Sequence, residues 1–206
     1  MSNIVLEACV DSLEQATRAE RMGAHRLELC ANLHLDGTTP DRETIEAVIG
    51  EVSIPVKVMI RPRGGDFIYT EDEFNQMLES IRMCKERGVP EIVTGVLDGQ
   101  NALDVKRIEA LANAASPMRV TIHKCIDVVP DVFVAIEQLK NIPGIHAVLS
   151  SGQSVDAISG AERLQQMLLA CGDQLTLIVA GKVTRENLEF LIREIGAMEY
   201  HGRKIV

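Results

Sequence analysis

Three sulfur-bearing side chains stand near the ends of three short apolar segments: Cys9, Cys30 and Met59. Alternate residues of an extended strand face opposite sides, so all three point away from the aliphatic residues beside them. Thiolate and thioether sulfur are soft ligands that select Cu(I) over hard cations. The pattern is compatible with a shared Cu(I) site in which Met59 is a third ligand. Buried cysteines are also common as small apolar packing residues, and strand alternation by itself favours that second interpretation.

The loop after the third segment concentrates arginine, glycine and acid, and it reads R-P-R-G-G-D-F over residues 61–67. Arginine offers planar, bidentate hydrogen bonds to a carboxylate or phosphate, and the glycine pair lets backbone N–H groups approach an anion closely. We therefore expect Arg61, Arg63 and Asp66 to form part of an anion-binding site. The alternative is a turn that an arginine–aspartate ion pair holds in place.

A further group of candidate residues comes from the second half of the chain: His123, Asp127, Ser151, Gly152 and His201. A histidine that ends a strand can act as a general acid or base, and Asp127, four residues later, could orient His123. Ser151 and Gly152 belong to an S-S-G-Q turn before a predicted helix, whose N-terminal N–H groups could hold an anion. We expect His201, on the last predicted strand, to face the same site.

Eight short apolar segments alternate with seven longer amphipathic stretches. The predicted strands cover residues 4–9, 26–30, 56–60, 91–94, 119–123, 146–150, 175–179 and 199–201. The predicted helices lie near residues 12–22, 40–50, 71–87, 103–115, 131–141, 155–171 and 184–195. This repeat of roughly 25–30 residues is typical of a (β/α)8 barrel of the TIM type. We expect one such domain over residues 1–206, without a final helix and with its site at the C-terminal ends of the strands.

Helix-capping patterns support these boundaries. Ser12 with Gln15 and Thr70 with Glu73 have the spacing of capping boxes, in which a hydroxyl and a longer polar side chain satisfy each other's backbone N–H groups. Pro40 is predicted at the first position of the second helix, where its missing N–H costs nothing.

Strand alternation also directs charged side chains toward the barrel axis, among them Glu7, Glu28, Lys57 and Arg61. Buried charge is costly unless it is paired, so we expect the two glutamates to pair with Lys57 and Arg61. Glu7, Glu28 and Lys57 either fill the barrel as an ion-pair layer without further function, or they assist catalysis, with Glu7 and Glu28 as acid–base groups. For Arg61, which ends a strand on the face where barrel enzymes keep their sites, the functional role is favoured.

Charge and cysteine content restrict the partners and the compartment. The formal net charge is −9 and the sequence pI is about 5.1, which disfavours nucleic acid and anionic membrane surfaces as general partners. The chain shows neither a secretory signal pattern nor an apolar run of the roughly 20 residues that a membrane helix requires. Five scattered cysteines without a C-x-x-C pair suit a reducing compartment, so we predict a cytoplasmic protein.

The motifs together resemble the CutC family, which is described as a family of copper homeostasis proteins. The resemblance implies a TIM-type barrel, a homodimer, a cytoplasmic location and Cu(I) binding by Cys9 and Cys30. It rests on L-E-A-C-V-D-S at 6–12, G-A-H-R-L-E-L-C at 23–30, I-P-V-K-V-M-I-R-P-R-G-G-D-F at 54–67, T-G-V-L-D-G at 94–99, H-K-C-I-D at 123–127 and S-S-G-Q at 150–153.

The chain departs from the family pattern in three places. Residues 124–126 read K-C-I where the family usually has R-A-F, A-G-K-V at 180–183 replaces a glycine-rich turn, and G-R-K at 202–204 replaces small residues. The last two places form a common phosphate site in TIM barrels. Cations such as Lys182 and Arg203 there change the ligand geometry that the resemblance would otherwise imply.

The sequence therefore supports two functional hypotheses. The first is a cytosolic copper homeostasis protein of the CutC family that binds Cu(I) through Cys9 and Cys30. The second is a TIM-barrel enzyme that acts on an unidentified small anionic substrate, a phosphate or a carboxylate. In that enzyme Arg61 and Arg63 would bind the anion and His123 would transfer protons. A purely structural role ranks third, because nothing in the sequence indicates a large exposed apolar surface.

Overall fold

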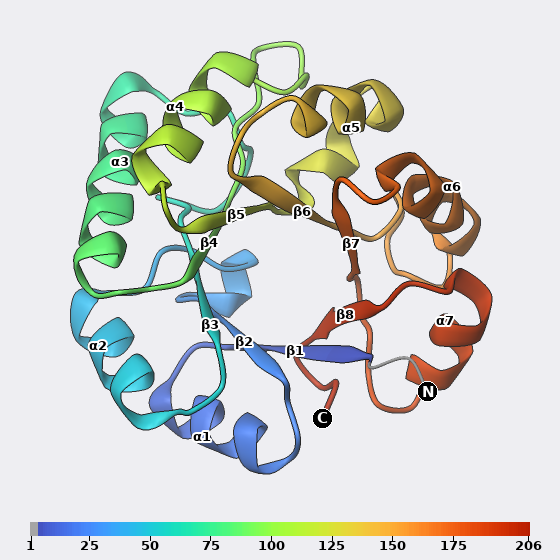
Figure 1. Ribbon diagram of the computed structural model, residues 1–206, viewed down its shortest axis with the longest axis horizontal. Helices are drawn as coiled ribbons and strands as arrows, with labels where there is room; N and C mark the ends of the chain where they lie inside the picture. The colour runs from blue at the N-terminus through green and yellow to red at the C-terminus, as the bar shows by residue number, and fades with distance from the viewer. Residues whose placement is uncertain (1–3) are drawn as a thin grey trace.

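The computed structural model describes residues 4–206, and their strands close into one parallel barrel in which every strand pairs with its neighbours in the chain (Figure 1). Pairing of the eighth strand with the first closes the ring. The predicted (β/α)8 barrel is therefore confirmed. The strands are β1 (Val5–Val10), β2 (Arg26–Leu29), β3 (Val56–Met59), β4 (Glu91–Thr94), β5 (Arg119–Ile122), β6 (Ile145–Ser150), β7 (Thr176–Val179) and β8 (Glu199–Gly202).

A helix follows each of the first seven strands and lies on the outside of the barrel (Figure 1). β8 is the last element of the chain, so the prediction of a barrel without a final helix is also confirmed. Two 3-10 helices, η1 (Leu33–Leu35) and η2 (Lys124–Val128), follow β2 and β5. The α-helices are α1 (Leu13–Arg21), α2 (Arg42–Glu51), α3 (Glu71–Glu86), α4 (Val105–Ala115), α5 (Val132–Lys140), α6 (Ala161–Cys171) and α7 (Leu188–Ile195).

The capping residues explain where several helices begin. Thr70 and Glu73 form the predicted capping box at the start of α3. Ser12 accepts a hydrogen bond from the backbone of Gln15, but the Gln15 side chain accepts from Asp11 rather than from Ser12, so the second predicted box is half formed. Each of these bonds satisfies a backbone N–H that has no partner within its helix.

α2 begins two residues later than predicted. Asp41 is its N-cap and accepts a hydrogen bond from the Thr44 backbone at 2.7 Å. Pro40 therefore lies before the cap instead of at the first helical position. A carboxylate cap satisfies an orphan N–H directly, and this outweighs the preference of proline for the first turn.

The last two helices also begin late, because the segments before them bond to strand-end loops. Residues 155–160 are irregular, and the Ala157 N–H donates to the carbonyl of Gly181, which follows β7. Thr184 forms an isolated parallel bridge with Lys204, which follows β8. These contacts hold residues that helical periodicity assigns to α6 and α7.

The strands separate the main hydrophobic core, which lies under the helices, from a mixed interior in which buried charges adjoin two small apolar clusters. Leu27, Leu29 and Val58 are fully buried between the strands and the helices, in the main hydrophobic core. Residues of opposite parity, such as Glu28 and Lys57, face the barrel axis and are also buried. The barrel centre is thus unusual for its fold, because branched apolar side chains normally dominate there.

Candidate functional site

A network of buried charges crosses the barrel axis. The Glu7 carboxylate accepts a hydrogen bond from Arg26 at 2.5 Å and lies 3.2 Å from Lys57 Nζ, which lies 2.6 Å from Glu91. The predicted pairing of Glu7 with Lys57 is therefore confirmed. Arg26 and Glu91 were missed, although strand alternation places Arg26 on the face of Glu28, and Glu91 is in register with Lys57.

The network fixes the ionisation of its acids. Burial alone would raise the pKa of Glu7, but Lys57, His201 and Arg26 hold it well below the usual range. Burial acts in the same way on Glu91, whose pKa His146 and Lys57 lower to about 2. Both glutamates are therefore carboxylates in the folded protein at neutral pH.

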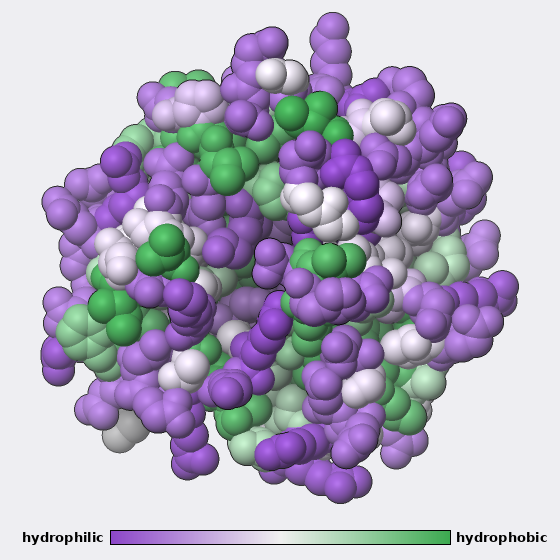
Figure 2. All heavy atoms as spheres, turned by 180° about the vertical axis from the view of Figure 1, so that it is seen from behind, coloured by the Kyte–Doolittle hydropathy of each residue, from purple (hydrophilic) through white to green (hydrophobic). Residues whose placement is uncertain are grey.

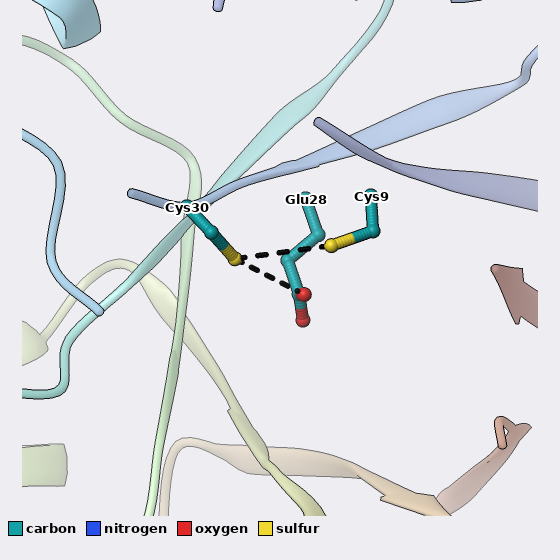
Figure 3. Close-up of side chains that lie close together, drawn as sticks. All are labelled: Cys9, Glu28 and Cys30. Atoms are coloured by element: carbon teal, nitrogen blue, oxygen red, sulfur yellow. Dashed lines mark hydrogen bonds between the residues drawn. The ribbon is translucent and has the colours of Figure 1, made fainter. Parts of the chain in front are cut away.

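Cys9 on β1 and Cys30 directly after β2 bring their sulfur atoms to 4.0 Å from each other (Figure 3). Cys30 Sγ also lies 3.4 Å from Oε2 of Glu28, and the three side chains point toward one another from two neighbouring strands. All three are buried, and their ligand atoms lie within 4.8 Å of one another. The structure thus brings together the two cysteines that the sequence proposed as metal ligands, and it adds a carboxylate.

The two thiols differ in acidity. The hydrogen bond from Cys30 lowers the pKa of Cys9 well below its usual value, against the effect of burial, and His201 adds to this. The same hydrogen bond, together with burial and Glu28, raises the pKa of Cys30. Burial also raises the pKa of Glu28 to about 8. Cys9 is therefore the more acidic thiol of the pair.

Met59, the third sulfur residue, packs with Cys9, Cys30 and Val93 in a small apolar cluster, against which Leu33 is also packed. The thioether and the two thiols therefore share one buried environment. An environment of sulfur and apolar side chains suits a soft cation such as Cu(I).

His201 lies with the glutamates. Its Nδ1 is 2.8 Å from Oε1 of Glu7, and its Nε2 is 3.7 Å from Oε2 of Glu28. Burial alone would lower the pKa of His201, but Glu28, Cys9 and Glu7 raise it well above its usual value. The predicted ion pair between Glu28 and Arg61 does not form, because Glu28 faces His201 and Cys30 instead.

A cavity of about 550 Å³ opens among the segments that follow the strands. Cys9, Glu28 and His201 line it together with Arg61 and His123. The face of the molecule in Figure 2 is hollowed near its centre and surrounded mainly by hydrophilic side chains. Members of both groups of candidate residues therefore line the same cavity: Cys9 and Met59 among the sulfur residues, and Arg61 and His201 among the predicted anion-binding residues.

Arg61 is held by backbone rather than by acids. Its Nη1 donates to the carbonyls of Leu35 and Gly37, both at 3.0 Å, and its Nη2 donates to Gly65 at 2.8 Å. The guanidinium lies 4.8 Å from the centre of the Phe67 ring. Its Nε has no hydrogen-bond partner among residues 4–206. The buried positive charge thus remains without a carboxylate in the described part of the chain.

The rest of the arginine loop is a structural turn. Arg63 forms ion pairs with Glu73 at 2.6 Å and with Asp66 at 2.9 Å, and it lies over the Tyr69 ring. Neither Arg63 nor Asp66 is among the cavity-lining residues. The structure therefore places both residues outside the cavity beside Arg61, and nearby acids neutralise Arg63.

The turn after β6 binds an internal anion. The Asp127 carboxylate accepts hydrogen bonds from the backbone of Ser151 and Gln153, both at 3.0 Å, and from the Ser151 hydroxyl at 2.9 Å. The cradle predicted at Ser151 and Gly152 is thus filled by the chain itself. Asp127 is fixed to this turn and does not orient His123 as expected.

His123 is buried against Phe67, with ring centres 4.9 Å apart, and its Nδ1 accepts a hydrogen bond from the Cys125 backbone. Burial, with Arg61 nearby, lowers the pKa of His123 to about 3, so the imidazole is neutral. Because Nδ1 is an acceptor, the proton sits on Nε2. That Nε2 has no partner among the described residues, which leaves one donor available on a cavity-lining side chain.

The cavity carries an excess of positive charge although the whole chain has a net charge of −9. Among the described residues, two acids, Glu28 and Asp36, line it. Positive charge gathered in a cleft attracts small anions from solution. The cationic lining residues are Arg61, Lys124, Lys182, Arg203 and Lys204.

Comparison with known proteins agrees with this geometry. The model of the CutC family matches residues 4–206. The chain belongs to the CutC family. CutC family proteins of Salmonella enteritidis and Salmonella typhimurium are each 41% identical to it over 198 residues, which is 96% of this chain and 79% of either relative. The crystal structure of CutC from Streptococcus agalactiae superposes with a TM-score of 0.93 at 32% identity, over 98% of this chain and all of that one.

More distant structures share the barrel alone. Dihydrodipicolinate synthase from Bacillus anthracis has a TM-score of 0.67 at 9% identity and covers 97% of this chain, which spans 69% of that enzyme. At such low identity the CutC chain shares only the architecture with the synthase. Within residues 4–206, no helix is both long and apolar enough to cross a membrane.

Proposed function

We propose that this CutC family protein binds Cu(I) through Cys9 and Cys30 and takes part in copper homeostasis. The observation that carries the proposal is the buried thiol pair with 4.0 Å between its sulfur atoms. Cys9 lines the cavity, so an ion has a path to the pair. The name of the related Streptococcus agalactiae protein links it to copper homeostasis.

The donor set fits the chemistry of Cu(I). Thiolate is a soft ligand, and the lowered pKa of Cys9 makes it the more easily deprotonated of the two thiols. A bound cation would displace the thiol proton of Cys30, because cysteine binds metal as the thiolate. Met59 lies in the same cluster and offers a third sulfur.

Anaerobic titration of Cu(I) against a competing chelator tests the proposal. The wild-type protein is expected to bind one equivalent tightly, and Cys9→Ser/Cys30→Ser is expected to lose this binding. Cys84→Ser/Cys171→Ser is the matched control, because both of its cysteines are buried in helices away from the cavity. Weak binding, or equal binding by the Cys9/Cys30 variant, would refute the copper role.

A second candidate function is an enzyme that acts on a small anionic substrate. It is favoured by two cavity-lining residues: His123, whose buried Nε2–H has no hydrogen-bond partner among residues 4–206, and Arg61, which carries a buried charge. In this reaction Arg61 would attract the anion, and His123 would donate a hydrogen bond to it or transfer a proton. Glu28, with its pKa raised to about 8, is the acid of the cavity that can hold a proton at neutral pH.

Binding of small phosphorylated and carboxylated metabolites, followed as an increase in melting temperature, tests this second function. Lys182→Ala/Lys204→Ala is expected to weaken such binding, whereas Lys85→Ala/Lys106→Ala, which removes two exposed lysines outside the cavity, is expected to leave it unchanged. Equal effects of both double variants would show that any binding is only a response to net charge.

We also propose that the protein is a cytoplasmic homodimer, as the family resemblance implies. Sedimentation equilibrium is expected to give twice the chain mass of 22.6 kDa. A mass equal to that of one chain across the micromolar range would exclude a stable dimer.

A further inference from the structure

The imidazole of His201 is held in one orientation by a buried carboxylate. Its Nδ1 lies 2.8 Å from Glu7, and Glu7 in turn is fixed by Arg26 at 2.5 Å and Lys57 at 3.2 Å. The other ring nitrogen, Nε2, is 3.7 Å from Glu28. His201 therefore presents Nε2 to the side chains beside Glu28, while Nδ1 is committed to Glu7.

This arrangement is the usual support of a metal-binding histidine. Such a histidine almost always donates its second N–H to a carboxylate or carbonyl, which fixes the ring and makes the ligating nitrogen more basic. Glu7 contacts both His201 and the positive charges of Arg26 and Lys57, so it is rigid enough for this task.

Glu28 connects His201 with the thiol pair. Glu28 belongs to two sets of possible metal ligands, and within each set the ligand atoms lie within 4.8 Å of one another. The first set is Cys9, Glu28 and Cys30, and the second is Glu7, Glu28 and His201. Oε1 of Glu28 is buried and has no hydrogen-bond partner among residues 4–206. A buried carboxyl oxygen without a hydrogen-bond partner is costly, and a cation that displaces the carboxyl proton would satisfy it.

We propose that Cys9, Cys30, Glu28 and Nε2 of His201 form one metal-binding centre for a divalent ion of borderline softness such as Zn²⁺. Zn²⁺ takes four ligands drawn from thiolate, imidazole and carboxylate, whereas Cu(I) needs only the sulfur pair. Glu7 is a positioning residue that acts through His201. The inference uses the same thiol pair as the proposed copper function, but it assigns the pair two further ligands and a second ion.

The position of this centre gives it access to ligands. Cys9, Glu28 and His201 line the cavity that also contains Arg61 and His123. An ion there would be reachable from solution, and exchange of Glu28 for an anion from the cavity would open one coordination position. Catalytic zinc sites keep a position of this kind open, whereas structural zinc sites are closed.

Zn²⁺ titration against a chromogenic chelator tests the ligand set. The wild-type protein is expected to bind one equivalent, and His201→Gln is expected to bind it about 100-fold more weakly, while His25→Gln, an exposed histidine at the other end of the barrel, leaves the affinity unchanged. No stoichiometric binding by the wild type, or equal affinity of His201→Gln, would overturn the inference.

Glu7 and Glu91 provide a matched pair for the positioning role. Both carboxylates pair with Lys57, but only Glu7 contacts His201. Glu7→Gln is expected to weaken Zn²⁺ binding about 10–100-fold, whereas Glu91→Gln, which also disrupts the buried network, should not. Equal loss in both variants would mean that Glu7 acts only through stability.

X-ray absorption of the zinc-loaded wild-type protein needs no variant and therefore stands even if a substitution prevents folding. We expect the first coordination shell of zinc to contain two sulfur ligands and two nitrogen or oxygen ligands, one of which is an imidazole. A coordination shell without imidazole overturns the proposal. Parallel Cu(I) titration separates the two ideas. Tight Cu(I) with no Zn²⁺ binding refutes this centre and leaves the copper function, whereas the reverse refutes copper and leaves the centre.

Discussion

The charged residues of the network around Lys57 are tolerated inside the barrel because they have partners of opposite sign. Lys57 has only 1% of its side chain exposed, yet it lies between Glu7 and Glu91 and donates to Thr121. Removing one member of such a buried set leaves another charge uncompensated, and that costs more than the intact pair contributes. The network therefore fixes the positions of its side chains, and substitution of any one member destabilises the protein.

Glu91→Gln is expected to lower the free energy of unfolding by about 3–5 kcal/mol at pH 7. The folded pKa of Glu91, about 2, lies below its ordinary 4.5, so this stabilisation is complete above pH 4.5 and is lost as the pH falls toward 2. Urea unfolding of both proteins at pH 7, 4 and 2.5 measures it. A difference that stays constant over this range would contradict the charge-based explanation.

Gly95 illustrates close packing beside the cavity. A Cβ there would lie 2.3 Å from Cys125 Sγ and 2.9 Å from Cε1 of His123, whereas a Cβ on Gly50, an exposed position in α2, would meet nothing within 4 Å. Gly95→Ala is expected to destabilise the protein by about 1–3 kcal/mol. Gly50→Ala is expected to stabilise it by about 0.5–1 kcal/mol, because glycine weakens a helix. Thermal unfolding compares the two, and equal effects would contradict the packing argument.

At the scale of elements, helix starts follow side-chain caps more closely than hydrophobic periodicity. Periodicity assigned residues 155–160 to a helix, but their backbone bonds to the loop after β7 instead. A contact with a distant loop is not encoded by local spacing, so it cannot be predicted from that segment alone. The capping box of α3, by contrast, involves only residues three apart and was predicted correctly.

Thr70→Ala removes this box and is expected to destabilise the protein by about 1 kcal/mol. Ser80→Ala, within the same helix, is the control and should change stability by less than about 0.5 kcal/mol. Chemical denaturation gives both changes in the free energy of unfolding, provided that the dependence of this free energy on denaturant concentration is the same for the variants and the wild type. A similar loss in the two variants would show that the hydroxyl of Thr70 has no capping role.

At the scale of the molecule, ring closure assembles the candidate site. β8 pairs with β1, and this places His201 against Glu7, which is 194 residues away in the sequence (Figure 1). The cysteine pair comes from β1 and the end of β2. A metal ion bound here would connect the first two strands of the barrel with the last.

Metal binding is therefore expected to stabilise the whole barrel. At a free ion concentration of roughly 1,000 times Kd, the free energy of unfolding should rise by about 4 kcal/mol. The melting temperature with and without Cu(I) or Zn²⁺ measures this, and Cys9→Ser/Cys30→Ser should show no increase. An equal increase in that variant would place the bound ion elsewhere.

The sequence by itself determined the barrel, the alternation that turns Cys9, Cys30 and Glu28 inward, and the family. These properties depend on periodicity and short motifs, which are local. Only the tertiary structure decided what each inward residue touches: Asp127 fills the serine turn, Arg63 is neutralised by Glu73, and His201 joins the glutamates. Their partners come from distant segments, and strand register and ring closure set those distances.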